Sequence, residues 1–140
     1  VYVLKDSKLY EMYENKEYTP LSVDDAIERV YYILKECKKT DVKIIRIGLQ
    51  TTDEITSSNS QIVGPVCDNF AEYVLSKIVL DDIEKYISKN NIKYEENIKK
   101  KMNIYTNNNY ASIIVGPEKV NKKYLKEKYG IDIKIKGENK

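Results

Sequence analysis

The residue types that usually carry catalysis are scarce in this chain. It contains no histidine and only two cysteines, Cys37 and Cys67. Without histidine there is no Ser-His-Asp or Cys-His arrangement, and the most common general base is missing. Two cysteines do not make the three-thiolate cluster that would hold an iron–sulfur centre, and neither a GxGxxG nor a P-loop motif occurs. We therefore expect no catalysis by this chain alone.

One segment, residues 46–55, combines groups that could bind a ligand or a partner. Arg46 lies within the apolar run Val42–Leu49, which predicts a buried strand. A buried guanidinium requires a partner, and ligands of α/β proteins bind at the carboxyl ends of strands. The candidate contact residues of this segment are Arg46, Gln50, Asp53 and Glu54. A structural Arg–carboxylate pair at an interface with another domain explains the same residues equally well.

The elements expected over the first 90 residues alternate between strands and helices. Ser22 is a good N-cap for an amphipathic helix over 23–39, and Ser7 begins a shorter helix. The full set comprises the strand Val1–Leu4, the helices Ser7–Tyr13 and 23–39, the strand Val42–Leu49, the short run Ile62–Pro65 and a helix over 69–89. This alternation predicts an α/β layer with parallel strands.

Residues 91–140 predict a second, smaller α+β region. A strand over Met102–Thr106 is followed by a helix over Glu118–Tyr129, which Gly130 ends, and by a strand over Ile131–Ile135. Residues 1–87 hold 11 basic and 16 acidic residues, a net charge of −5, whereas residues 88–140 hold 13 and 6, a net charge of +7. This asymmetry indicates an anionic partner for the basic end. We expect domains at residues 1–90 and 91–140.

Several motifs of the first 90 residues together resemble one protein family. The first match is between Arg46–Ile55 and the stretch R-x-G-L-Q-P-T-D-E-I. The second is between Ile62–Pro65, followed by Phe70–Val74, and the patterns V-x-G-P and A-F-x-E-L-V. The third is between Leu4–Leu9, followed by Tyr18–Ser22, and the patterns V-K-G-T-x-L and Y-x-P-L-S. These patterns are similar to bacterial radical-SAM proteins of the Elongator catalytic subunit (histone acetyltransferase-like) family. The resemblance covers about residues 1–88.

The resemblance implies an accessory role. In such proteins an upstream barrel holds a 4Fe-4S cluster and S-adenosylmethionine, and residues 1–90 would form the edge of that barrel and complete it. Val1 opens directly into a strand-like run, so we expect a longer parent chain with this catalytic domain upstream. By analogy the substrate would be tRNA at the wobble uridine. Gly64, Pro65 and Cys67 are further interface candidates, although Cys67-Asp68 replaces the family's His-Pro and Thr51 replaces its Pro.

The basic end carries a second resemblance. Residues 113–135 resemble the core of a KH RNA-binding domain, in which a Gly-x-x-Gly loop clamps the nucleic-acid backbone. Here the loop reads Gly116-Pro117-Glu118-Lys119 and lacks the second glycine. The RNA-binding candidates are Gly116, Lys119, Lys122, Lys123 and Lys126. A small β-α-β element with a solvated lysine-rich helix is the alternative interpretation.

We therefore expect a non-catalytic C-terminal accessory region of a radical-SAM, iron–sulfur enzyme, which acts in tRNA binding and completes the catalytic barrel. The alternatives are a modular RNA-binding protein and a structural or dimerisation module. Two cysteines without disulfide spacing fit a reducing cytoplasm, and no apolar run approaches the roughly 20 residues that span a bilayer. The heavy use of Lys, Asn and Ile is typical of a low-GC genome.

Overall fold

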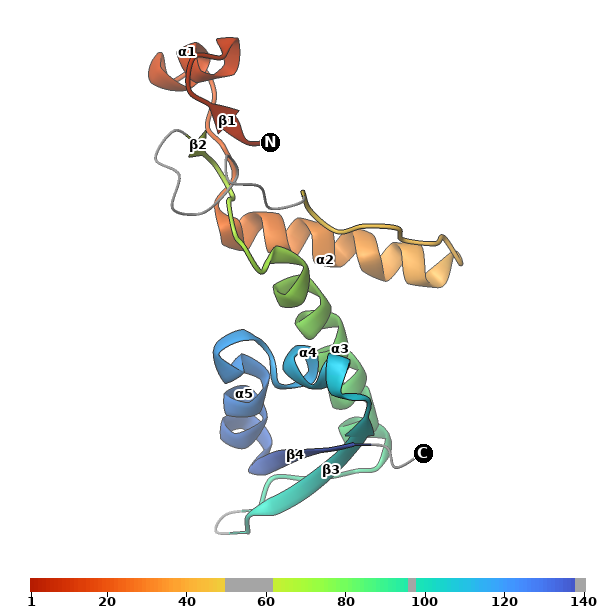
Figure 1. Cartoon of the computed structure of the whole chain (residues 1–140). Coiled ribbons are helices and arrows are strands. Elements are labelled where there is room, and N and C mark those ends of the chain that lie inside the picture. Colours follow the sequence, from red (N-terminus) through yellow and green to blue (C-terminus); the bar gives the residue numbers. More distant parts are fainter. Residues whose placement is uncertain (50–61, 96–97, 138–140) are drawn as a thin grey trace. The chain divides into compact units, whose positions relative to one another are not determined.

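The computed structural model describes residues 1–49, 62–95 and 98–137 (Figure 1). The chain divides into two compact units, Val1–Val74 (unit 1) and Leu75–Lys140 (unit 2). The division falls inside helix α3, which extends over Phe70–Lys89. A boundary between folding domains at residue 90 stays a prediction, because compactness alone does not define a domain.

The helices of unit 1 begin where the sequence predicts. Helix α1 (Lys8–Glu14) starts after Ser7, whose hydroxyl accepts a hydrogen bond from the backbone N–H of Tyr10 at 3.2 Å. Helix α2 (Val23–Lys39) starts after Ser22, whose hydroxyl accepts from the N–H of Asp25 at 3.1 Å. In both helices the cap satisfies an N–H that has no partner within the helix. The buried residues of α2 lie on one face, at Ala26, Ile27, Tyr31 and Leu34.

The two strands of unit 1 are short and antiparallel. Strand β1 (Val3–Leu4) pairs with β2 (Ile62–Val63), with Val3 opposite Val63. The expectation of parallel pairing in the first 90 residues is therefore wrong for the strands that the structure describes. Gly64, with φ of +131°, and Pro65 follow β2 directly, and proline has no N–H to extend the ladder. The pair is thus limited to two residues on each side.

The prediction of a buried strand over Val42–Leu49 is also wrong. The segment contains no strand and runs back beside α2 in Figure 1. Its apolar side chains are largely exposed, with Ile45 at 91% and Leu49 at 56% of full exposure. Arg46 is exposed as well, so the guanidinium is not buried as we expected. A β-branched run forms a strand only where a neighbouring strand offers backbone partners, and none of the described residues does so.

Unit 2 is built on a pair of parallel strands. Strand β3 (Lys100–Thr106) pairs with β4 (Ile131–Gly137) from Lys100 opposite Ile131 to Thr106 opposite Gly137. A parallel pair needs a crossover connection. Here the crossover contains the 3₁₀ turn Asn108–Tyr110, α4 (Ala111–Val115), the 3₁₀ turn Pro117–Lys119 and α5 (Val120–Tyr129). Gly130 ends α5 with φ of +66°, as its position in the sequence predicts.

The core of unit 2 lies between the strands and the helices. Figure 1 shows α3, α4 and α5 on the same side of the β3–β4 pair. The buried cluster takes residues from each of the three helices and from β4, namely Ile83, Ile87, Ile114, Leu125, Ile131 and Ile133. A two-stranded sheet is marginal by itself, and the helical layer supplies the burial that stabilises it. The α/β class expected from the sequence is confirmed.

Candidate functional site

The turn between α4 and α5 has an uncommon backbone conformation. Gly116 adopts φ of +79°, and Glu118 and Lys119 adopt φ of +53° and +62°. A side chain at Gly116 would bring a Cβ to 2.8 Å from Val120 Cγ1, so only glycine fits there. Two consecutive non-glycine residues in the left-handed region cost free energy, because their Cβ atoms crowd the backbone. Lys119 thus stands where glycine is favoured, at the position of the second glycine in a Gly-x-x-Gly loop.

A buried asparagine fixes this turn. The Asn121 side chain is 2% exposed, and its amide nitrogen donates to the carbonyl of Ser76 at 2.9 Å and to the carbonyl of Ile114 at 3.2 Å. The first turn of α5 is therefore tied both to α3 and to the end of α4. Sequence reasoning missed Asn121, although a polar residue on the side of a helix that also carries Leu125 is the signal that could have indicated it.

Three of the predicted RNA-binding lysines lie in or directly before α5. Lys119, Lys123 and Lys126 are exposed; Lys123 and Lys126 are three residues apart on one side of α5, and Lys119 directly precedes the helix. Lys122 instead forms an ion pair with Asp132 of β4 at 3.1 Å. The hydrogen bond from Lys122 holds the pKa of Asp132 below its ordinary value, with the nearby charges contributing further. We refer to the exposed Lys119, Lys123 and Lys126, together with the buried Gly116 that shapes the turn, as the turn face.

A second polar cluster connects α3 to α5. Glu84 Oε1 accepts hydrogen bonds from Tyr124 Oη at 2.9 Å, Lys128 Nζ at 2.9 Å and Tyr129 Oη at 2.7 Å. Burial alone would raise the pKa of Glu84, but the three donors outweigh it and the pKa lies below its ordinary value. The hydrogen bond to Glu84 is the largest cause that raises the pKa of Tyr129. Lys128 therefore stabilises unit 2 and does not belong to the turn face.

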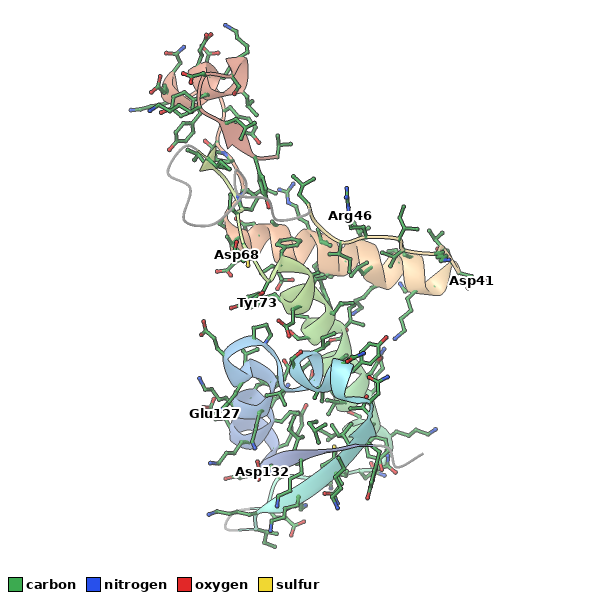
Figure 2. All side chains as sticks on the ribbon, in the orientation of Figure 1. Asp41, Arg46, Asp68, Tyr73, Glu127 and Asp132 are labelled. Carbon is green, nitrogen blue, oxygen red and sulfur yellow. The ribbon has the colours of Figure 1, made fainter. Side chains whose placement is uncertain are left out.

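The predicted site residues of unit 1 fall into two groups. Arg46 is exposed on the segment that follows α2 (Figure 2), while Gln50, Asp53 and Glu54 lie outside the described residues. Gly64 lies close to the chain start, where an added Cβ would approach the carbonyl oxygen of Val1 to 3.1 Å. The contact role of all these residues stays a prediction.

The region after β2 brings two separate motifs together. Gly48, from the Arg46–Ile55 motif, and Pro65, from the Gly-Pro motif, line one cavity of about 220 Å³ together with Tyr2, Arg29 and Phe70. A Cβ on Gly48 would lie 3.3 Å from Phe70 Cδ1, so the ring packs directly against this glycine. Two stretches that the family resemblance singles out are thus neighbours in the fold.

The interface candidate Cys67 is a half-buried free thiol near this region. Burial is the main cause that raises the pKa of the Tyr2 hydroxyl, and the charges of Cys67 and Asp68 contribute to the same shift. Tyr2 itself is half-buried and lines the cavity.

Metal binding and membrane crossing each make demands that the described residues do not meet. Among the described residues, no three His, Cys, Asp or Glu side chains are grouped so as to hold a metal ion. The whole sequence offers two cysteines and no histidine, so these residues do not fit an iron–sulfur cluster. In the part of the chain that the structure describes, no helix has the length and apolar content that crossing a membrane requires.

Comparison with known proteins places unit 1 in a family. The model of the radical-SAM C-terminal domain matches residues 1–79, which is more than half of the 140 residues. No curated protein and no solved structure matches the chain. The match spans Gly48, Pro65 and the cavity that they line. This chain belongs to the radical-SAM C-terminal domain family.

Proposed function

We propose that the chain is the non-catalytic, substrate-side region of a radical-SAM enzyme of the Elongator type, that it binds tRNA, and that residues 1–90 complete the catalytic barrel. The observation that carries this proposal is the family match over residues 1–79 on a chain with no histidine and two cysteines. The catalytic domain of radical-SAM proteins supplies the 4Fe-4S cluster and S-adenosylmethionine. The residues of this chain would bind and position the substrate.

The exposed segment Val42–Leu49 supports a role in completing a barrel. Val42, Ile45 and Leu49 are 57%, 91% and 56% exposed. Clustered apolar side chains in solvent are unfavourable, and they mark surfaces that a partner covers. A strand of the catalytic domain would both cover these side chains and supply the backbone hydrogen bonds that the segment lacks among the described residues.

The turn face supports an RNA partner. Lys119, Lys123 and Lys126 present three exposed charges beside the turn whose conformation Gly116 permits. Phosphates bind to exposed ammonium groups of this kind. Glu118, in the same turn, is exposed and would oppose a phosphate, so the three lysines must dominate. Wobble-position tRNA is the substrate class that the Elongator resemblance implies.

The test is a titration of labelled tRNA, followed by fluorescence anisotropy at several salt concentrations. Each phosphate contact contributes about 0.7–0.9 to the slope of log K against log salt. We expect the triple variant Lys119→Ala, Lys123→Ala, Lys126→Ala to reduce that slope by about 2. The matched control, Lys5→Ala with Lys43→Ala and Lys89→Ala, removes the same charge from exposed positions elsewhere and should leave the slope close to that of the parent chain.

Two outcomes contradict the proposal. If the chain binds no tRNA at low salt and light scattering detects a stable dimer, the dimerisation module is the better interpretation. If iron–sulfur reconstitution of this chain alone gives the absorbance of a bound cluster, the chain is not the accessory part of the enzyme.

A further inference from the structure

The side of the β3–β4 pair that faces away from the helices carries a distinct set of side chains. Alternate residues of a strand point to opposite faces. The inward residues belong to the core, so the residues between them point outward. The outward residues are Lys101, Asn103 and Tyr105 from β3 and Asp132, Lys134 and Lys136 from β4. We call Lys101, Asn103, Tyr105, Lys134 and Lys136 the sheet face.

The sheet face carries one exposed aromatic ring, that of Tyr105. Tyr105 is 59% exposed, although it lies within the paired part of β3. Lys136 lies opposite it in the register and holds its Nζ 5.8 Å from the centre of the ring. An exposed aromatic ring beside a cation offers a flat surface for stacking and a charge for a phosphate.

The charge of the sheet face is positive. Lys101, Lys134 and Lys136 are exposed, and the carboxylate of Asp132 already pairs with Lys122. Because Asn103 lies opposite Lys134 and Tyr105 lies opposite Lys136, amide, ring and ammonium groups are interleaved along the two strands. An anionic ligand with flat, hydrogen-bonding rings complements this pattern.

A groove adjoins the strands of the sheet face. In the described part of the chain β3 pairs only with β4, so its second edge is open. The groove has a volume of about 710 Å³, and its lining includes Tyr86, Asn91, Lys101, Asn103 and Tyr105 together with the apolar Ile92, Met102 and Ile131. An extended peptide would be held in such a place mainly by backbone pairing and apolar pockets. The groove combines amide, tyrosine and lysine side chains with these three apolar residues, and this mixture of hydrogen-bonding, cationic and flat apolar groups fits nucleotide bases and phosphates.

We propose that the sheet face and the adjoining groove bind single-stranded nucleic acid, with one base stacked on Tyr105 and phosphates beside Lys134 and Lys136. This site uses other residues than the turn face, although Asp132 on the same side of the strands pairs with Lys122 of α5. It rests on the proposed function in taking RNA as the natural partner. Together the two surfaces would let unit 2 hold an unpaired stretch of a folded RNA.

The experiment measures binding of the whole chain to a short labelled oligouridylate and, in a parallel arm, to oligothymidylate. Loss of one stacked base costs about 1–3 kcal/mol, so Tyr105→Ala should weaken binding by about 5-fold to 100-fold. Tyr105→Phe keeps the ring and should bind like the parent chain. Lys134→Ala with Lys136→Ala should lower the salt slope by about 1.4. The matched control is Tyr32→Ala, which removes a ring that is 62% exposed in unit 1.

The outcomes separate this inference from the proposed function. Equal binding by the Tyr105→Ala variant and the Tyr32→Ala variant overturns the inference, as does the lack of any oligonucleotide binding at low salt. If tRNA binding depends on Lys119, Lys123 and Lys126 but not on Tyr105, the proposed function survives and the sheet face is not a site. Tyr105-dependent oligonucleotide binding without tRNA binding supports the sheet face and contradicts tRNA as the substrate. Stronger binding of the ribose arm would indicate contacts to the 2′-hydroxyl groups.

Discussion

The buried amide of Asn121 donates to the carbonyl of Ser76, a residue 45 positions earlier in the chain, at 2.9 Å. This hydrogen bond fixes the start of α5 on α3, and with it the turn that carries Lys119. Removal of Asn121 should therefore affect both the stability of unit 2 and the geometry of the turn face.

We expect Asn121→Ala to lower the free energy of unfolding by about 1–3 kcal/mol, because it removes two buried hydrogen bonds and leaves a small void. Urea denaturation followed by circular dichroism measures this. The control Asn109→Ala changes an exposed asparagine in the same unit and should alter the free energy by less than about 0.5 kcal/mol. Equal effects of the two variants would contradict the structural role of Asn121.

Gly116→Ala should also destabilise unit 2. The backbone at φ of +79° and ψ of 152° lies in a region that is essentially restricted to glycine, and the new Cβ would meet Val120 Cγ1 at 2.8 Å. Strain of this kind costs about 1–3 kcal/mol before any steric adjustment. Thermal melting measures the loss, and Gly137→Ala, at an exposed glycine outside the positive-φ set, serves as the control. A melting temperature of Gly116→Ala that matches this control would refute the conformation assigned to the turn.

The stability of unit 2 should fall in acid in a way that depends on Glu84. The pKa of Glu84 is depressed from 4.5, because its three hydrogen-bond donors outweigh the effect of burial. The ionised carboxylate therefore stabilises the folded state fully above pH 4.5, and this contribution disappears as the pH falls through the lower folded-state pKa. Glu84→Gln should flatten this part of the curve of unfolding free energy against pH.

The control for that prediction is Glu127→Gln, which changes an exposed glutamate of α5 that Figure 2 labels. The Glu127→Gln curve should keep the steep acid limb of the parent chain. Urea denaturation from neutral pH to pH values below 4 measures both curves. An acid limb that is just as steep in Glu84→Gln as in the parent would show that other carboxylates account for the pH dependence.

Two isoleucines of unit 1, one in the exposed segment Val42–Leu49 and one in α2, differ greatly in burial. Ile45 is 91% exposed, whereas Ile27 is 7% exposed on the buried face of α2. In this chain, Ile45→Lys should change the unfolding free energy by less than about 0.5 kcal/mol, while Ile27→Ala should cost about 2–4 kcal/mol. Chemical denaturation of both variants decides between the exposed segment of this structure and the buried strand that the sequence indicates. A large loss of unfolding free energy in Ile45→Lys would favour the prediction of a buried strand over Val42–Leu49.

The features that were predicted correctly depend on few neighbouring residues. Ser7 and Ser22 cap helices through hydrogen bonds to N–H groups three residues later, and Gly130 ends α5 because its left-handed conformation suits glycine. The break at Gly116-Pro117 was expected for the same reason, but the helix predicted to begin at Glu118 begins at Val120, because Glu118 and Lys119 adopt positive φ. Such signals act within a few residues, so a single sequence contains them in full.

The features that were missed depend on residues far apart in the chain. Val42–Leu49 has the composition of a strand, but a strand also needs a partner, which the sequence does not specify. The hydrogen bonds from Tyr124 and Tyr129 to Glu84 join residues that are 40 and 45 positions apart in the chain. The ion pair between Lys122 and Asp132 forms only because α5 and β4 pack together. Local periodicity cannot distinguish a lysine that is held in an ion pair from one that faces solvent.

The parallel direction of β3 and β4 has a consequence for how unit 2 folds. Lys100 and Ile131 pair although the whole crossover separates them in the chain. The two strands therefore cannot begin to pair at a tight hairpin turn. Closing that loop costs entropy before the strands gain any hydrogen bond, and helix docking must precede or accompany pairing. We therefore expect the β3–β4 pair of unit 2 to form late in folding, after the helices of the crossover.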